Sequence, residues 1–216
     1  MNANTNANPF TTIPDELDRL AQEEFVKRRR FDQRVSILIF PSDRIEGAIE
    51  LARMGARVTL ADRAEQQRTV EGHALAAGLR DQIGFSPMSL PALPESFDGE
   101  PFDIIICRRA LSALPYPEAR RIVRQLMQRL KIGGKLFISA LGMHSELGEG
   151  YAGSEQPIEE RYGKLSPAIA KKYCIDHPVC LYTERNLFLL LLEAGASVLR
   201  TLTTTYGNVK GVAVRV

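Results

Sequence analysis

The sequence predicts an α/β protein built on a doubly wound, mostly parallel sheet. Short apolar runs rich in β-branched residues alternate five times with stretches of helical periodicity along the 216 residues. Such alternation is typical of a parallel sheet with helices on both faces. Two apolar strands then close the chain, and the turn Tyr206-Gly207-Asn208 between them is short enough to make them an antiparallel hairpin.

Composition favours a single soluble domain and no charged macromolecular partner. Hydrophobic residues make up 44% of the chain, and 28 basic against 26 acidic residues leave a net charge of +2. That balance gives no electrostatic case for nucleic acid or for a membrane surface. The three cysteines match no metal or disulfide spacing, and the chain shows neither a secretory leader nor a spanning stretch. We therefore expect a cytoplasmic protein.

The N-terminal region divides into two parts. Residues 1–11 are mostly Asn, Ala and Thr, which predicts a disordered tail. Residues 12–34 predict a helix that begins near Pro14 and ends on a basic turn, 27–30. Those cations either offset the negative helix end in solvent or bind phosphate. Residues 35–216 form the remaining domain.

Within that domain, each expected element has its own boundary signal. The expected strands are 35–40, 58–61, 83–86, 102–107, 135–139, 197–204 and 209–216. The expected helices are 45–54, 64–77, 117–131 and 184–192. Gly55, Gly133-Gly134 and Gly195 are expected to end three of these helices, and Thr183 is expected to cap the last one.

Three stretches together resemble class I S-adenosylmethionine-dependent methyltransferases. They are VSILIFPSDRIEGAIELARMGARVTLAD, FDIIICRRALSALPYPEARRIVRQLMQRLKIGGKLFIS and LYTERNLFLLLLEAGASVLRTLTTTYGNVKGVAV. The resemblance covers about residues 35–216 and implies a seven-stranded sheet that ends in an antiparallel hairpin. It also implies S-adenosylmethionine as cofactor, bound beyond the carboxyl ends of the strands.

The loop after the first strand departs from the family pattern. That pattern, roughly G-x-G-x-G, falls on Pro41, Asp43 and Ile45, none of which is glycine. Side chains at these positions would project toward the methionine and ribose parts of the cofactor. Beside Ser42, Asp43 has two interpretations: it bonds the cofactor's ammonium group, or it caps the next helix.

The other cofactor contacts are assigned to the ends of strands two, three and four. Asp62 ends strand two about 20 residues after the loop, where a carboxylate can accept from both ribose hydroxyls or cap the next helix. Arg63 then lies near the adenine edge. Met88 and Ser89 stand where an acid often follows strand three, and Met88 either packs on adenine or fills the core. Cys107 either faces the methyl group or is a buried filler.

Residues 142–178 follow strand five and form the expected lid or substrate segment. Its aromatic and histidine side chains either contact a substrate, one as a base, or are ordinary packing and surface residues; they are His144, Tyr151, Tyr162, Tyr173 and His177. The histidines, His73 included, lack metal-ligand spacing.

Three functional hypotheses remain open. The first is a methyltransferase acting on a small molecule. The second is a non-catalytic methyltransferase-like protein that binds a partner protein, favoured by the missing loop glycines and the missing acid after strand three. The third, a nicotinamide-dependent oxidoreductase, is disfavoured by the lack of G-x-G-x-x-G and by the closing hairpin. The sequence fixes neither the methyl acceptor nor the oligomeric state.

Overall fold

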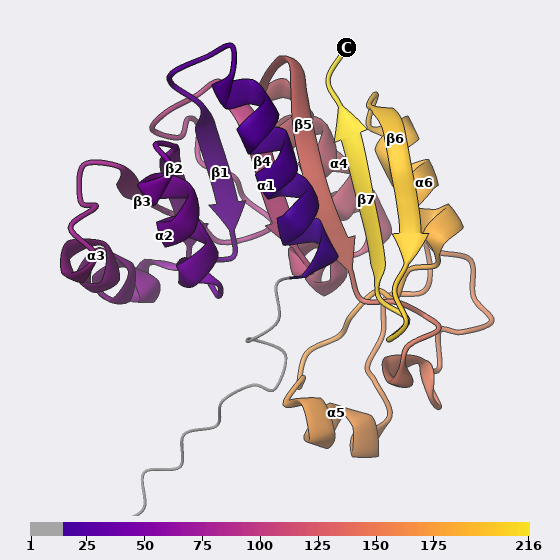
Figure 1. The fold of residues 1–216 in the computed structure, drawn as a ribbon. Helices are drawn as coiled ribbons and strands as arrows, with labels where there is room; N and C mark the ends of the chain where they lie inside the picture. The colour runs from indigo at the N-terminus through magenta and orange to yellow at the C-terminus, as the bar shows by residue number, and fades with distance from the viewer. Residues whose placement is uncertain (1–14) are drawn as a thin grey trace, which may run out of the picture.

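A single seven-stranded sheet lies at the centre of the computed structural model, which describes residues 15–216 (Figure 1). The strands are β1 (Ser36–Phe40), β2 (Arg57–Asp62), β3 (Ile83–Pro87), β4 (Phe102–Arg108), β5 (Leu130–Ala140), β6 (Ser197–Thr203) and β7 (Val209–Val214). Their order is β3-β2-β1-β4-β5-β7-β6. β7 runs antiparallel to both β5 and β6, whereas the pairings among β1 to β5 are parallel. The predicted fold class is therefore confirmed. The predicted 1–11 tail lies outside the described residues.

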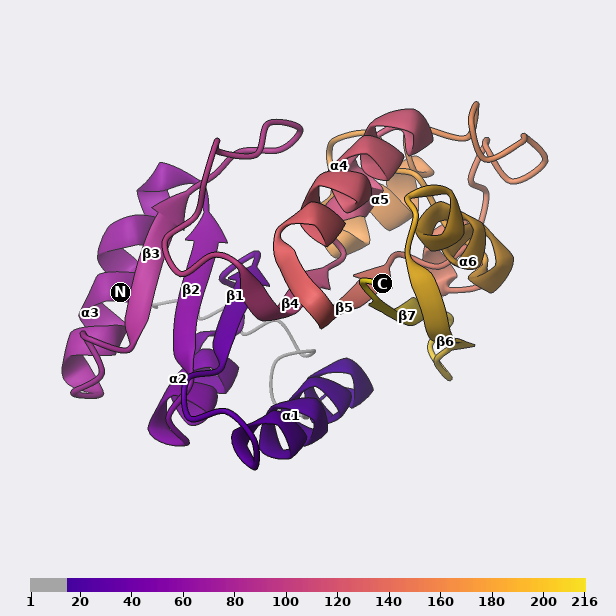
Figure 2. The ribbon, with the colours of Figure 1, turned by 90° about the horizontal axis from the view of Figure 1, so that it is seen from above.

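Helices cover both faces of this sheet (Figure 2). They are α1 (Glu16–Arg29), α2 (Ile45–Arg53), α3 (Gln67–Ala76), α4 (Tyr116–Gln128), α5 (Pro167–Tyr173) and α6 (Glu184–Glu193). Buried side chains of α1, α2 and α3 share one core with the sheet, and those of α4 and α6 share the other. Among residues 15–216, no helix has both the length and the hydropathy needed to cross a bilayer.

Helix α1 is held on the sheet by apolar burial and by ion pairs. Leu17, Ala21 and Phe25 are almost fully buried. Glu24 is also buried and accepts from Arg28 at 2.8 Å and from Lys135 of β5 at 2.6 Å. The interpretation of a wholly solvated basic turn is therefore wrong for Arg28, which also lies 3.4 Å from the buried carboxylate of Asp103 in β4.

The connection between α4 and β5 differs from the prediction. The helix ends at Gln128, and β5 begins at Leu130, so Gly133-Gly134 lies inside the strand instead of ending the helix. The pairing register of β4 and β5 shifts between Phe102 and Ile104. The amide of Gly133, which has a φ of +75°, donates to the carbonyl of Arg215. The two glycines therefore allow the backbone to kink at a β-bulge in β5.

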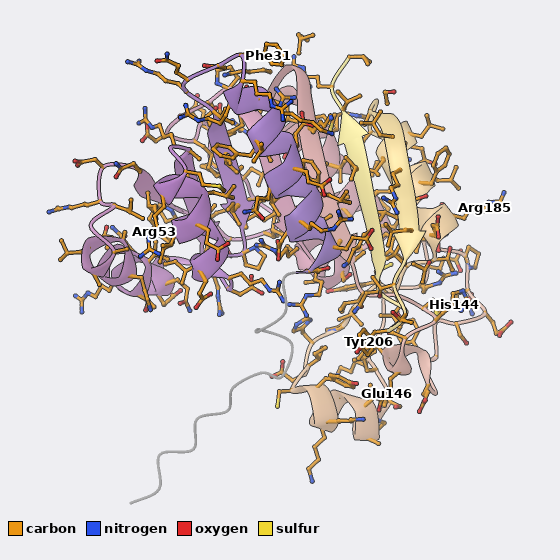
Figure 3. All side chains as sticks on the ribbon, in the orientation of Figure 1. Phe31, Arg53, His144, Glu146, Arg185 and Tyr206 are labelled. Carbon is orange, nitrogen blue, oxygen red and sulfur yellow. The ribbon has the colours of Figure 1, made fainter. Side chains whose placement is uncertain are left out.

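The hairpin between β6 and β7 packs tightly against the segment that follows β5. In Figure 3, Tyr206 of the hairpin turn, His144 and Glu146 are all labelled beyond the end of the sheet. A Cβ atom added to Gly142 would overlap the carbonyl group of Gly207, and one added to Gly207 would overlap the backbone of His144 and Ser145. Two backbone segments are therefore in direct contact here, and glycine is required on both sides.

We expect Gly142→Ala to destabilise the protein by about 1–3 kcal/mol or more, because backbone atoms cannot move aside as a flexible side chain can. Gly47 is the matched control. It lies inside α2 with nothing within 4 Å of an added Cβ, so Gly47→Ala should stabilise the protein by about 0.5–1 kcal/mol. Thermal unfolding of both variants measures the difference, and equal melting temperatures would contradict the packing described.

Lys210 of β7 provides a titratable contact between the sheet and the start of α1. Its side chain is buried and contacts Asp15, the N-cap residue of α1. Burial lowers the pKa of Lys210 to about 8 from its ordinary 10.5. The folded protein therefore releases this proton at a lower pH than the unfolded chain does.

The sign of the resulting pH dependence follows from proton linkage. Between pH 8 and 10.5 the unfolded state binds more protons, so the contribution of Lys210 to the free energy of unfolding rises with pH. We expect the free energy of unfolding of the wild type to rise relative to that of Lys210→Met across this window. Urea unfolding at several pH values measures that difference. A fall across the same window would mean that the charge pair with Asp15 dominates instead.

Candidate functional site

The candidate site lies at the carboxyl edge of the sheet, where β1, β2 and β4 end. The chain leaves β1 toward β2 on one side, and β4 lies on the other side of β1. Such a reversal of strand order leaves a crevice outside the strand ends, which is where doubly wound proteins bind ligands. Residues 41–44 connect β1 to α2 at this point, and α1 begins at the same edge (Figure 1).

The first contact of this loop is with the end of β2. The backbone amide and the hydroxyl of Ser42 both donate to Oδ2 of Asp62, at 2.9 and 2.8 Å. The other carboxylate oxygen, Oδ1, accepts from the amide of Arg63 at 2.8 Å. Asp62 is half-buried and Arg63 is exposed. Asp62 therefore holds the loop by hydrogen bonds, at the position where the resemblance to methyltransferases places the ribose of the cofactor.

The second contact joins the loop to the residue that follows β4. Oδ2 of Asp43 lies 3.4 Å from a guanidinium nitrogen of Arg109, and both side chains are about 40% exposed at 41% and 38%. Arg109 has a φ of +53°, a left-handed conformation that is uncommon for a residue with a side chain and that often occurs at functional sites. Exposed ion pairs contribute little to stability, so a ligand can displace this one at low cost.

The third contact joins the loop to α1. Arg44 donates to Oδ2 of Asp18 at 2.6 Å, and Nε of Arg108 donates to Oδ1 of the same carboxylate at 3.0 Å. Arg108 is the last residue of β4 and only 4% exposed. The N-cap residue of α2 is Arg44, and no side chain caps the helix. The interpretation of Asp43 as its cap is therefore wrong.

The other predicted site residues lie around this edge in different environments. Pro41 is half-buried, and Ser89 is exposed just beyond β3. Met88 belongs to the core, and its amide donates to the carbonyl of Asp62 at 2.7 Å. Cys107 is fully buried in the core between the sheet and α4, where burial raises the pKa of its thiol far above the ordinary value.

Two residues of this site were not singled out from the sequence. Asp18 and Arg44 come from separate elements and have no characteristic spacing. One sequence signal could have pointed to them: the loop after the first strand carries charged residues where the family has glycine. A charged side chain so close to a ligand site needs a partner of opposite charge.

The segment after β5 has a small core of its own, although its composition is polar. Its buried members are Leu147, Tyr151, Leu165, Ile169, Val179 and Leu181. Arg161 is 9% exposed and donates to the carbonyl of Leu181 at 3.1 Å and to the side chain of Asn186 at 2.9 Å. Tyr162 donates to the carbonyl of Ala113 at 3.0 Å, just after β4. The segment is therefore attached to both α6 and the end of β4.

The remaining candidates in the segment do not converge on the crevice. His144 and His177 are exposed, and Tyr173 donates to Glu146 at 2.6 Å within the segment itself. Among residues 15–216, no group of three His, Cys, Asp or Glu side chains could hold a metal ion.

The donor set at the carboxyl edge suits an adenosine-bearing cofactor in its chemistry. Oδ1 of Asp62 accepts one described hydrogen bond, and a carboxylate oxygen has room for two. Asp43 is an exposed carboxylate, and NH1 of Arg108 is a buried donor without a hydrogen-bond partner. Asp62, Asp43 and Arg108 thus supply an acid for hydroxyls, an acid for an ammonium group and a cation for a carboxylate. Each of them is bonded to another residue of the chain.

Comparisons with known proteins agree with this architecture. Residues 46–138 match a family described as "Methyltransferase domain". A relative named ubiquinone biosynthesis O-methyltransferase, from Xanthomonas euvesicatoria pv. vesicatoria, is 37% identical over 92 residues. That match covers 42% of this chain and 36% of the relative, so the chain matches about a third of the length of such relatives.

Solved structures show the same fold. A SAM-dependent methyltransferase from Methanosarcina mazei is 22% identical, with a TM-score of 0.64 over 88% of this chain and 97% of that one. Magnesium protoporphyrin IX methyltransferase from Synechocystis PCC 6803, solved with bound SAH, is 18% identical, with a TM-score of 0.62 over 93% of this chain and 82% of that one. Residues 46–138 therefore resemble a methyltransferase domain, and the chain has the same fold as these methyltransferases.

The burial of two of the three thiols predicts a simple labelling result. Cys107 and Cys180 are buried with no solvent exposure, and burial raises the pKa of Cys180 to about 11, whereas Cys174 is exposed. Because the thiolate is the reactive form, we expect one equivalent of thiol to react with an aromatic disulfide reagent in the native protein and three after denaturation. Rapid native reaction of Cys107 would show that the end of β4 is open.

Proposed function

We propose that this chain is an S-adenosylmethionine-dependent methyltransferase acting on a small molecule. The observation that carries the proposal is the position of Asp62. It ends β2, beside the loop that follows β1, at the point where the strand order reverses. This is where doubly wound folds place an acid for a ribose, and Asp62 lies within the part of the chain that matches the methyltransferase family.

In this proposal the chain's own residues bind and orient the cofactor. Asp62 accepts from the ribose hydroxyls once Ser42 gives up its hydrogen bonds, and Asp43 accepts from the ammonium group once it leaves Arg109. Met88 packs near adenine, and Arg63 and the amide of Ser89 lie at its edge. Pro41, Ser42 and the backbone of Cys107 border the methyl group's side of the crevice.

The chain's contribution to the reaction is alignment and exclusion of water. The bound cofactor supplies a methyl group on a sulfonium that is already activated for in-line displacement. Holding the acceptor in line can account for a large part of a rate enhancement. In the proposal, residues 142–178 cover the acceptor from the side of β4 and β5, with Tyr162 anchoring them to the 110–113 turn.

A second candidate function is a non-catalytic, methyltransferase-like partner protein. It is favoured by the loop itself, in which Ser42, Asp43 and Arg44 are each bonded to another element of the same chain. A loop that satisfies its own polar groups needs no ligand to be stable. In that case the fold would serve to bind another protein.

Isothermal titration calorimetry with S-adenosylmethionine separates the two candidates. We expect saturable binding in the micromolar range, lost in Asp62→Ala because the ribose acceptor is removed. Asp98→Ala is the matched control, since Asp98 is an exposed carboxylate that pairs with Arg57 at the opposite end of β2. The absence of heat from the wild type at high cofactor concentration, with a protein that co-purifies, would favour the partner function.

A further inference from the structure

We propose that this chain forms a symmetric dimer, in which α1 of each copy lies in a groove between α1 and the strands β6 and β7 of the other copy. The occupant of the groove is thus a second copy of the same chain. Glu16 of α1 contacts Arg200 of β6, whereas Asp18 contacts Arg44 on the opposite side of the helix. The interface therefore lies away from the loop after β1. It goes beyond the proposed function, because it requires neither cofactor binding nor methyl transfer.

The first observation is a part of the sheet that is covered on one face only. α6 packs against β6 and β7, and α1 packs against β4 and β5. These two helices lie on opposite faces of the sheet, as Figure 2 shows. On the α1 face, no helix among residues 15–216 covers β6 and β7 (Figure 1). That face of the last two strands is therefore open to a further layer of structure.

The second observation is the apolar character of this open face. A groove lies between α1 and the two strands, and its apolar lining consists of Leu20, Phe137, Leu199 and Val212. Leu199 is 53% exposed. The open face of an antiparallel sheet normally carries polar side chains, and exposed apolar residues that lie together commonly mark an interaction surface. The groove therefore suits the apolar side of a helix.

The third observation is that α1 itself matches the groove in length and in side chains. α1 has 14 residues and is ~21 Å long, and the 7 residues of β6 span ~23 Å. Leu20 lies on the groove side of α1, and Val26 is 44% exposed on its outer side. A second α1 can lie beside the first, with Leu20 on the seam and Val26 against the strands of the other copy. Each copy supplies both the helix and the groove, as a two-fold interface requires.

The fourth observation is the order of charges along this seam, which favours a second copy over another partner. Glu16 and Lys27 lie on the groove side of α1 but are about three turns, or ~16 Å, apart, so they cannot pair within one helix. In an antiparallel pair of α1 helices with Leu20 near the two-fold axis, Glu16 of each copy lies opposite Lys27 of the other. A parallel pair would bring like charges together. The sequence of α1 is therefore complementary to itself in one orientation.

The cations of the strands that border the groove have acidic partners in the same chain. Arg200 of β6 lies 3.4 Å from Glu16, and Lys135 of β5 donates to Glu24 at 2.6 Å. A cation taken out of water is costly when it is unpaired. These ion pairs therefore allow a second copy to exclude water from the groove.

The first test is the molar mass in solution, measured by size-exclusion chromatography with light scattering. We expect twice the 24.0 kDa of a single chain. Leu199→Glu should weaken dimerisation ~100-fold or more, because an unpaired carboxylate enters the apolar contact. Leu75→Glu is the matched control, since Leu75 is an exposed leucine of α3, and it should remain dimeric. A wild type that is monomeric at the highest soluble concentration would overturn the proposal, and so would equal effects of the two variants.

The second test is a charge reversal that distinguishes the antiparallel seam from other ways of dimerising. Lys27→Glu and Glu16→Lys should each weaken dimerisation ~10-fold, because like charges then face each other across the seam. Glu16→Lys/Lys27→Glu should recover most of that affinity. The recovery can arise only between copies, since the two side chains are too far apart on one helix. A double variant that dimerises no better than either single variant would contradict the antiparallel seam.

Residues 1–13 are the alternative occupant of the groove, because they precede α1 in the same chain. We expect a variant that lacks them to remain dimeric. A monomeric wild type that loses thermal stability when residues 1–13 are deleted would show that the chain's own segment covers the groove. A dimer that dissociates on this deletion would show that the segment, and not the α1 seam, joins the copies. Either result would overturn the proposal.

Discussion

The hydrogen bonds from Ser42 to Asp62 are the interaction on which the rest of the site depends. They tie the loop after β1 to the end of β2, at the place where related folds leave room for a cofactor. Asp43 and Arg44, the next two residues, extend the same pattern to β4 and α1. A loop without glycine is thereby held in position by its own side chains, each bonded to a different element.

This arrangement makes α1 part of the site. Asp18 contacts Arg44 and Arg108 because the buried side chains of α1 fix this helix on the sheet. Two ion pairs add to this: Glu24 with Lys135 of β5, and Asp15 with Lys210 of β7. Binding a ligand then becomes an exchange, in which internal partners are released and ligand groups replace them. Such an exchange is inexpensive where the pair is exposed, as for Asp43 and Arg109, and costly where it is buried, as for Arg108.

Much of the fold could be predicted because periodicity and capping are local signals. The capping box of Thr183 and the positive φ of Gly55 and Gly195 lie where the sequence indicated. The end of α4 could not be predicted, because Gly133-Gly134 suits a helix terminus as well as a strand bulge, and the choice depends on a contact with distant Arg215.

The candidate site was predictable only in part. Asp62 could be located by its distance in sequence from the loop. Its hydrogen bonds with Ser42 could not, because they depend on the loop conformation, and this loop lacks the glycines of the family pattern. The contacts of Asp18 span 26 residues to Arg44 and 90 residues to Arg108. They depend on how α1 crosses the sheet, for which a single sequence holds no signal.

Amide hydrogen exchange at Ser42 tests the central claim most directly. In the free protein this amide should be strongly protected, because it donates to Asp62, and the protection should be lost in Asp62→Ala while the amides of β1 remain protected. Exchange at Ser42 as fast as in an unstructured peptide would contradict the account, since it would show a loop that is open to solvent and not braced by the end of β2.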